Sequence, residues 1–383
     1  MKTTAIINGM FYTPNGVVNS GVLLISGKTI LDVGSKDQIR IPKNANIIDA
    51  NEKPVIPGLI DLKIHGAMGY DAMGTGLAEI IKLLPSHGVT SFMAGTLINA
   101  RDSIIDGVKI MAEIIESPPL GANCLGIHLE GPYLSRKRSG IANLEYLYPL
   151  SMPDFEEIQK FAKKQIKLVT FAPEDGHAME CIPELLKLGV EPVIGHSDAS
   201  FDQVKSAVEL GLRHSAHVFN AMRPFQHREP GVVGAIMYFD QLYAELIADG
   251  VHIHPAVFEI LIRIKGLEKI ILISDAYRFA GLPDGEYHWG EMVVHISKSR
   301  CELSDGSFMG SHAFLDAGVR NLAKFANIPF EKAIASATSN PAKSIGAKNK
   351  GFLASGYDAD LVLLDSQLKP MLTIVGGETV WSK

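Results

Sequence analysis

The sequence predicts an α/β protein: a parallel (β/α)8 TIM-like barrel that carries a small β-sandwich domain built from both chain ends. The centre of the chain alternates strand-like apolar runs with helical patterns, whereas both ends hold only short strand-like runs. The length of 383 residues suits a large barrel with an accessory domain. We therefore expect residues 1–53 and 347–383 to form the small domain and residues 54–346 the barrel.

The two ends of the chain share one character, which is short apolar runs separated by turn residues. Three such runs lie near each end: residues 5–7, 21–25, 28–33, 360–365, 372–375 and 378–381. Asn15-Gly16 and Ser26-Gly27 separate the early runs, and Gly376-Gly377 between the last two is typical of a hairpin. Because the centre lacks this character, we expect the two ends to meet in one domain.

The centre contains eight strand-like runs. They end near Leu62, Thr96, Glu130, Phe171, His196, His217, Ala248 and Asp275. Most precede a helical pattern, as at residues 77–87, 178–188 and 201–210, and Ser200 and Gln203 have the spacing of a capping box. After the eighth run, the pattern predicts an extra β segment at residues 283–303, followed by two closing helices at residues 311–326 and 331–337.

A metal centre is predicted where four of these runs end, because active sites of such barrels lie at the C-terminal strand ends. Glu130 offers a carboxylate oxygen, and His196 and His217 offer imidazole nitrogens. Two histidines and one carboxylate with an open position are typical of a hydrolytic zinc or ferrous site, whose cation lowers the pKa of water. Asp275 then serves as general base and later as general acid.

The alternative is that these residues are unrelated polar residues that cap strands. Each residue taken alone favours that alternative, but four suitable donors at four strand ends are hard to reconcile with chance. His128, two residues before Glu130, is expected to pack inside the barrel and hydrogen-bond to a neighbour. His252 lies just beyond the seventh strand end, where it either faces the substrate or is a satisfied core residue.

The composition excludes several classes of protein. Hydrophobic residues make up 46% and charged residues 20% of the chain, which excludes disorder. The net charge of −6 and the lack of clustered Lys and Arg exclude nucleic acid and acidic membranes as expected partners, and no run approaches a membrane span. The three separated cysteines, Cys124, Cys181 and Cys301, predict buried thiols in a reducing compartment, the cytoplasm.

The chain resembles the amidohydrolase superfamily, and most closely its N-acetylglucosamine-6-phosphate deacetylases. Eight segments over nearly the whole chain carry the resemblance: PGLID at 57–61, HLEGP at 128–132, GHSD at 195–198, FNAM at 219–222, REPG at 228–231, ADG at 248–250, SD at 274–275 and DADL at 358–361. Together they are specific, although DADL alone would indicate only the β domain of the superfamily.

The resemblance implies a homodimer that uses a divalent metal, zinc or Fe(II), to remove acetate from a phosphorylated N-acetyl amino sugar, and the Lys63 departure described below reduces the expected content to one divalent metal ion per subunit. The resemblance implies that Glu130, His196 and His217 hold the metal and that Asp275 is the catalytic acid and base. It further implies that four residues meet the substrate: Asn220, Ala221, Arg228 and His252. Guanidinium suits a phosphate dianion, and Arg228 is expected to reach across the dimer; a solvated loop charge is its alternative.

Two departures from the family pattern concern the site. Many relatives have His-x-His at the first strand end for a second metal, whereas this chain has Lys63-Ile64-His65. A protonated lysine has no lone pair to donate, so we expect the second metal site to be lost and the centre to be mononuclear. The loop at Ser139–Asn143 also lacks the histidine that helps to hold the sugar in relatives.

The leading hypothesis is hydrolysis of the N-acetyl group of an N-acetylhexosamine 6-phosphate, most closely N-acetylglucosamine 6-phosphate. One alternative is the galactosamine epimer or another amidohydrolase substrate, such as a cyclic amide or an N-acyl amino acid. Another is a non-catalytic sugar-phosphate-binding protein, for which Lys63 and the altered loop are the only support.

Overall fold

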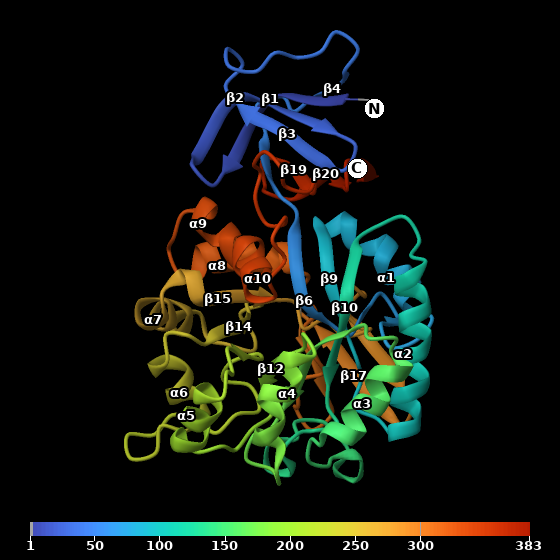
Figure 1. Cartoon of the computed structure of the whole chain (residues 1–383), viewed down its shortest axis with the longest axis vertical. Coiled ribbons are helices and arrows are strands. Elements are labelled where there is room, and N and C mark those ends of the chain that lie inside the picture. Colours follow the sequence, from blue (N-terminus) through green and yellow to red (C-terminus); the bar gives the residue numbers. More distant parts are fainter. Residues whose placement is uncertain (1–2, 299) are drawn as a thin grey trace.

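The computed structural model describes residues 3–298 and 300–383 and consists of a small β domain above a barrel (Figure 1). Both chain ends lie in the small domain. Its sheet has the order β21-β20-β19-β5-β1-β2-β3, with β4 beside β1. The strands are β1 (Thr3–Thr13), β2 (Gly16–Ser26), β3 (Thr29–Gly34), β4 (Asn46–Asp49), β5 (Pro54–Pro57), β19 (Leu361–Leu364), β20 (Pro370–Val375) and β21 (Glu378–Ser382).

The expectation that the two ends meet is confirmed by this sheet. β19 from the tail pairs antiparallel with β5, and β5 pairs with β1. Strands from both ends enclose one apolar core, to which Phe11, Leu23, Leu361 and Ile374 belong. The sandwich-like domain is therefore held together by contacts between residues more than 300 positions apart in the sequence.

The position of the domain boundary stays a proposal. β5, at Pro54–Pro57, adds a strand to the terminal sheet directly before β6 enters the barrel (Figure 1). We propose that the crossover lies at Gly58, a few residues later than the sequence-based boundary after residue 53. Only glycine fits at residue 58, because the backbone there passes so close to Thr90 that a Cβ would lie 2.0 Å from its Oγ1.

The barrel consists of eight parallel strands in the order β15-β14-β13-β12-β11-β10-β9-β6, as predicted. They are β6 (Leu59–Ile64), β9 (Val89–Gly95), β10 (Asn123–Glu130), β11 (Ile166–Phe171), β12 (Glu191–Ile194), β13 (His214–Ser215), β14 (Tyr243–Ile247) and β15 (Ile270–Ile273). A parallel bridge between Ile64 and Ala276 joins the two edge strands. The C-terminal ends of all eight strands therefore meet in one ring.

A ring of helices covers the barrel (Figure 1). The helices after successive strands are α1 (Leu77–Leu83), α2 (Arg101–Glu116), α3 (Met152–Phe161), α4 (Ile182–Lys187), α5 (Phe201–Glu209), α6 (Gly231–Tyr238), α7 (Pro255–Lys265) and α8 (Leu315–Phe325). The predicted capping box of α5 is present, with Ser200 Oγ accepting from Gln203 N and Gln203 Oε1 accepting from Ser200 N. No helix among the described residues combines the length and apolar character that crossing a bilayer needs.

Smaller elements complete the fold. The predicted extra β segment is a three-stranded antiparallel sheet of β16 (Gly285–Trp289), β17 (Met292–Ser297) and β18 (Arg300–Leu303). α9 (Phe330–Ile334) matches the second closing helix, and α10 (Ser339–Ser344) follows it without having been predicted. A two-stranded sheet, β7 (Gly66–Ala67) with β8 (Tyr70–Asp71), lies after the first barrel strand.

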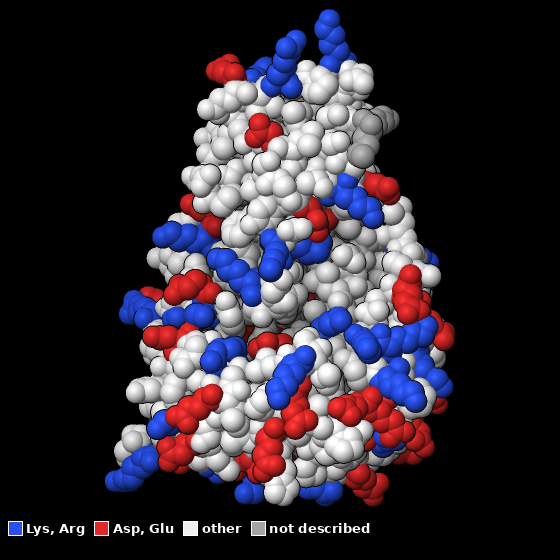
Figure 2. Space-filling model, in the orientation of Figure 1, with Lys and Arg blue, Asp and Glu red and all other residues white. Residues whose placement is uncertain are grey.

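Figure 2 shows how charged side chains are distributed on one face of the molecule. Lys and Arg side chains alternate with Asp and Glu side chains over the barrel in Figure 2, and the terminal domain is largely uncharged on this face. Charges of both signs are therefore interspersed on this face.

Candidate metal centre and active site

The four predicted donors leave their strands at one end of the barrel. Glu130 is the last residue of β10, and His196, His217 and Asp275 each stand two residues beyond the ends of β12, β13 and β15. These last three residues have left-handed backbones, with φ of 47°, 21° and 49°. Such conformations cost non-glycine residues roughly 1–3 kcal/mol each and tend to gather at functional sites. The sharp turns aim the three side chains over the barrel mouth.

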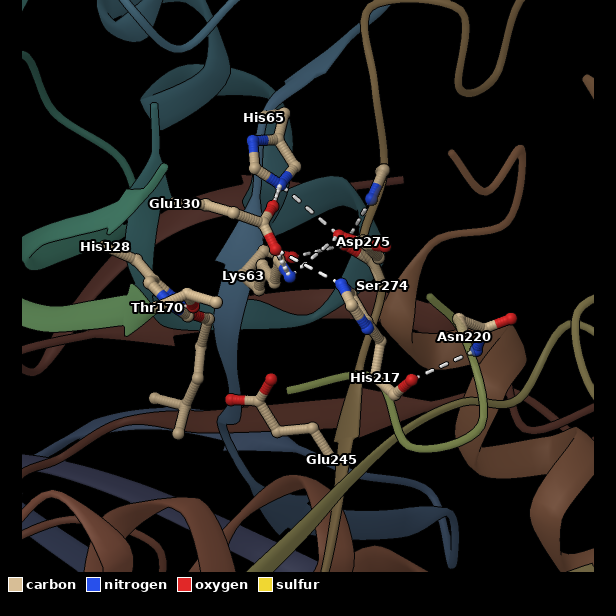
Figure 3. A network of polar contacts seen from close by, with 12 residues as sticks. Lys63, His65, His128, Glu130, Thr170, His217, Asn220, Glu245, Ser274 and Asp275 are labelled. Carbon is tan, nitrogen blue, oxygen red and sulfur yellow. Dashed lines mark hydrogen bonds and ion pairs between the residues drawn. The ribbon is translucent and has the colours of Figure 1, made fainter. Parts of the chain in front are cut away.

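Glu130 lies at the centre of the cluster, with Lys63, His65, His217 and Asp275 around it (Figure 3). Its Oε1 is 3.2 Å from His217 Nε2 and 3.7 Å from His196 Nε2. The His196 and His217 rings stand nearly perpendicular, with centroids 4.9 Å apart. One donor atom from each of Glu130, His196 and His217 lies within 4.8 Å of the others, so the three can share one cation.

The backbone of the loop after β10 orients His196. Its Nδ1 is 2.8 Å from the carbonyl oxygen of Arg138, which leaves Nε2 on the side of Glu130. Burial, and next the neighbouring His217, lower the pKa of His196 to about 4. The imidazole is therefore neutral at pH 7 and has a lone pair available for a metal.

A second group of donors shares Glu130 with the first. Donor atoms of His65, Glu130 and Asp275 also lie within 4.8 Å of one another. His65 Nε2 is 3.0 Å from Glu130 Oε2 and 3.3 Å from Asp275 Oδ1, although neither contact has hydrogen-bond geometry. The other ring nitrogen, Nδ1, is 2.9 Å from the carbonyl oxygen of Thr96, which holds the ring with Nε2 directed at the two carboxylates.

Lys63 lies beside two residues of this second group, Glu130 and Asp275. Its side chain is fully buried, and its Nζ contacts Glu130 Oε1 and lies 3.8 Å from Asp275 Oδ1. Burial alone would raise the pKa of both carboxyl groups and lower that of the lysine. The attraction between Lys63 and the carboxylates outweighs this effect, so the pKa values of Glu130 and Asp275 are lowered and that of Lys63 is raised.

A deeper layer of the barrel holds a separate polar network. His128 hydrogen-bonds to the Leu62 carbonyl at 3.0 Å and to Thr170 Oγ1 at 2.7 Å, as expected for a satisfied core histidine. Burial lowers the pKa of His128 to about 4. Below it, the fully buried Glu245 is 2.9 Å from His214 Nε2. This second pair carried no sequence signal, because each residue sits within an otherwise ordinary strand.

The structure places two of the four expected substrate residues beside the cluster. Asn220 donates its side-chain amide to the carbonyl oxygen of His217 at 3.2 Å, and Ala221 follows it with a φ of 49°. Asn220 is thereby tied directly to the backbone of a predicted metal ligand. The backbone turn through these two residues presents them beyond the end of β13.

His252 and Arg228 differ in how the chain holds them. His252 Nδ1 is 2.7 Å from Asp249 Oδ2, and its ring packs against Phe308 at 5.0 Å. Burial alone would lower the pKa of His252, but the hydrogen bond with Asp249 raises it above its usual value.

Arg228 is exposed on the loop between β13 and α6, and it takes part in none of the ion pairs found among the described residues.

The loop at Ser139–Asn143, which lacks the family histidine, packs against the metal centre. A Cβ at Gly140, whose φ is 60°, would lie 3.2 Å from Cε1 of His196. At the other side of the centre, a Cβ at Gly95 would lie 2.7 Å from the His65 ring. Sequence reasoning missed both glycines and the Arg138 carbonyl. Only their contacts with the His196 and His65 rings in the folded chain reveal them, because none of the three contributes a functional side chain.

The residues present fit a divalent cation. Among the described residues, His217 Nδ1 is buried without a hydrogen-bond partner, and an orphaned polar atom on one of three clustered donors fits an ion-binding role. A carboxylate oxygen has two lone pairs, so Glu130 Oε1 can accept from Lys63 with one and bind a cation held by the two histidines with the other. Two neutral imidazoles and a carboxylate are a donor set for zinc or Fe(II).

Known proteins resemble this chain over its whole length. Residues 55–380 match the Amidohydrolase family. The N-acetylglucosamine-6-phosphate deacetylase of Lysinibacillus sphaericus is 37% identical over 96% of this chain and 98% of its own length. The crystal structure of the deacetylase of the same name from Thermotoga maritima is 30% identical and superposes with a TM-score of 0.89, covering 99% of this chain and 100% of that one.

A third relative was solved with a ligand. It is a variant of the N-acetyl-D-glucosamine-6-phosphate deacetylase from Mycobacterium smegmatis in complex with N-acetyl-D-glucosamine-6-phosphate, 26% identical, with a TM-score of 0.91 and 100% coverage of both chains. Fold, length and sequence agree across these relatives. The chain therefore belongs to the amidohydrolase family and, within it, to the N-acetylglucosamine-6-phosphate deacetylases.

Proposed function

We propose that this protein hydrolyses the N-acetyl group of N-acetylglucosamine 6-phosphate, giving acetate and the amino sugar 6-phosphate. The observation that carries the proposal is the cluster of Glu130, His196 and His217 with Asp275 beside it, at the mouth of a barrel whose relatives bear that name. The protein is thus an amide hydrolase of the amidohydrolase family.

We propose that Glu130, His196 and His217 hold one divalent ion, zinc or Fe(II). Such an ion supplies Lewis acidity, since it lowers the pKa of water and polarises an amide carbonyl. The proposal is supported by the mutual distances of the three donors and by the neutral His196. Incubation with a chelator should remove activity, and added zinc or ferrous ion should restore it.

We assign proton transfer to Asp275. Its carboxylate stays ionised because Lys63 and His65 favour the charged form, so it can accept a proton from the attacking water. It then delivers that proton to the nitrogen of the departing amine. His252, held by Asp249, is positioned to donate a hydrogen bond to the substrate as charge develops on its carbonyl oxygen.

We propose that Asn220, the backbone of Ala221 and Arg228 meet the sugar phosphate. Asn220 and Ala221 lie beside His217, whereas Arg228 is exposed on its loop. An exposed guanidinium suits a phosphate of the neighbouring subunit, so we propose a homodimer in which Arg228 reaches across.

The three cysteines are free and buried, which supports a cytoplasmic location.

A single assay of released amine tests the proposed function. N-acetylglucosamine 6-phosphate should be turned over, and its unphosphorylated form should react far more slowly because the phosphate contacts are lost. Equal rates for the two would favour another amidohydrolase substrate. Faster turnover of the galactosamine epimer would assign that substrate instead, and no turnover of any N-acyl compound with metal present would leave only a binding role.

A further inference from the structure

The Lys63 side chain is buried in the barrel, although lysine side chains are rarely buried in proteins. Its side chain has no exposure, and its Nζ lies between Glu130 and Asp275 (Figure 3). A buried ammonium is tolerated only when it is paired, because removing it from water costs several kcal/mol. The two carboxylates provide that pairing.

The backbone around Lys63 fixes this place. The Lys63 carbonyl oxygen accepts a hydrogen bond from Asp275 N at 3.0 Å, and the Lys63 N–H donates to Asp61 Oδ1 at 3.3 Å. The same Asp61 oxygen accepts from Ser274 N at 3.1 Å. The first barrel strand and the end of the eighth are thereby locked together, with the ammonium directed at the two carboxylates.

The ammonium contacts Glu130 and lies 3.8 Å from Asp275, two of the three residues of a possible metal-binding set. His65, Glu130 and Asp275 have the mutual distances of a cation site and share Glu130 with the set formed by His196 and His217. A second cation would meet the ammonium at contact distance, where like charges repel strongly in a buried place. Only one of the two can be present.

We propose that Lys63 is a built-in cation that takes the place of a second metal ion and positions Glu130 and Asp275 for the single ion of the proposed deacetylase site. This inference rests on the proposed function. Lys63 is a positioning residue, since it acts through the two carboxylates. The alternative is an ordinary structural ion pair, which would leave the metal content of the protein unchanged when it is removed.

Three substitutions separate these two roles. Lys63→Met removes the charge at similar length, Lys63→Arg keeps it, and Lys63→His replaces it with a lone-pair donor beside His65. Lys265→Met is the matched control, because Lys265 is also buried but contacts the carbonyl oxygen of Phe239. Each purified protein is stripped of metal, dialysed against excess zinc, and measured for metal per chain and for Tm with and without zinc.

We expect about one zinc per chain for wild type, Lys63→Arg and Lys265→Met, and about two for Lys63→His and Lys63→Met. We also expect zinc to raise the Tm of Lys63→Met by several degrees more than that of wild type, because two buried carboxylates are left without a counter-charge. If Lys63→Met does not fold, the count for Lys63→His decides.

One zinc per chain in Lys63→His, or two in wild type, would overturn the proposal. These readouts do not depend on turnover. If the metal counts are as expected but N-acetylglucosamine 6-phosphate is not hydrolysed, the proposed function fails and the role of Lys63 stands. If the substrate is hydrolysed but the metal count does not change in the Lys63 variants, the proposed function stands and the proposed role of Lys63 fails.

Discussion

At the scale of single residues, Asp275 combines burial with two charged neighbours. Its Oδ1 is 3.3 Å from His65 Nε2 and 3.8 Å from Lys63 Nζ, and it has no hydrogen bond among the described residues. Burial would favour the neutral acid, but Lys63 and His65 hold the pKa below its usual value. An ionised carboxylate with a free oxygen is suited to accept a proton.

Asp275→Asn removes the proton acceptor while keeping the size of the side chain. We expect kcat to fall by about 10²- to 10⁴-fold, the typical contribution of a general acid and base, and binding of the sugar phosphate to change little. Steady-state kinetics and calorimetric titration measure the two quantities. Asp32→Asn, on an exposed strand position, is the control. Turnover that survives in Asp275→Asn would remove this residue from the mechanism.

The donors of the site could be predicted from the sequence because each follows an apolar run at a strand end. Their neighbours could not. Lys63 meets Glu130 across the barrel interior, 67 positions away, and only its departure from His-x-His drew attention to it. Arg138 acts through a backbone carbonyl, which every residue has, so no residue type could have indicated it.

At the scale of elements, the ends of strands and helices position the site. β9 ends at Gly95, where the His65 ring lies against the backbone, and α5 begins just after the segment that carries His196. Turn-forming residues and helix-capping residues in the sequence made many of these strand and helix ends predictable. α10 was missed because its few residues, with a proline inside, give no helical periodicity.

Gly95→Ala places a Cβ 2.7 Å from the His65 ring, so the ring must move away from Glu130 and Asp275. We expect turnover to fall by about 10- to 100-fold, since small misplacements in an active site are costly. Gly318→Ala in α8 is the control, because its Cβ would lie 3.8 Å from Ala248, an ordinary contact. Kinetics of the two variants decide, and equal activities would contradict the close packing at Gly95.

Ser200→Ala removes the side-chain cap of α5. We expect the free energy of unfolding to fall by about 1 kcal/mol, with kcat nearly unchanged, because the cap's hydrogen bonds join only Ser200 and Gln203 and involve no metal donor. Denaturant titration measures the loss. Ser206→Ala, an exposed position within the same helix, should be neutral; a comparable loss there would show that the cap is not the cause.

At the scale of the whole molecule, strands from the two ends of the chain form one domain on the N-terminal side of the barrel, and the candidate site lies at the opposite end. Thr373 in β20 donates a buried hydrogen bond to the Pro85 carbonyl at 2.7 Å, which joins the terminal sheet to the first barrel helix segment. The overall architecture was predictable from the alternation of patterns. How β5 joins the terminal sheet was not, because its few apolar residues fit either domain.

The proposed homodimer can be tested by mixing two inactive variants. If Arg228 completes the site of its partner, Arg228→Ala and Asp275→Asn subunits should complement each other in mixed dimers. Random reassociation makes about half of the dimers mixed, each with one intact site of two, so about a quarter of the wild-type activity should return. Activity that stays at the level of the separate variants would place Arg228 in its own subunit's site or outside any site.

The most direct test of the central claim is the anomalous diffraction signal of the zinc- or iron-loaded crystal, recorded at the absorption edge of that metal. We expect one strong peak per chain, within coordination distance of Glu130, His196 and His217, and no peak among His65, Glu130 and Asp275, where Lys63 Nζ approaches the two carboxylates. A peak at the second place, or none at the first, would contradict it.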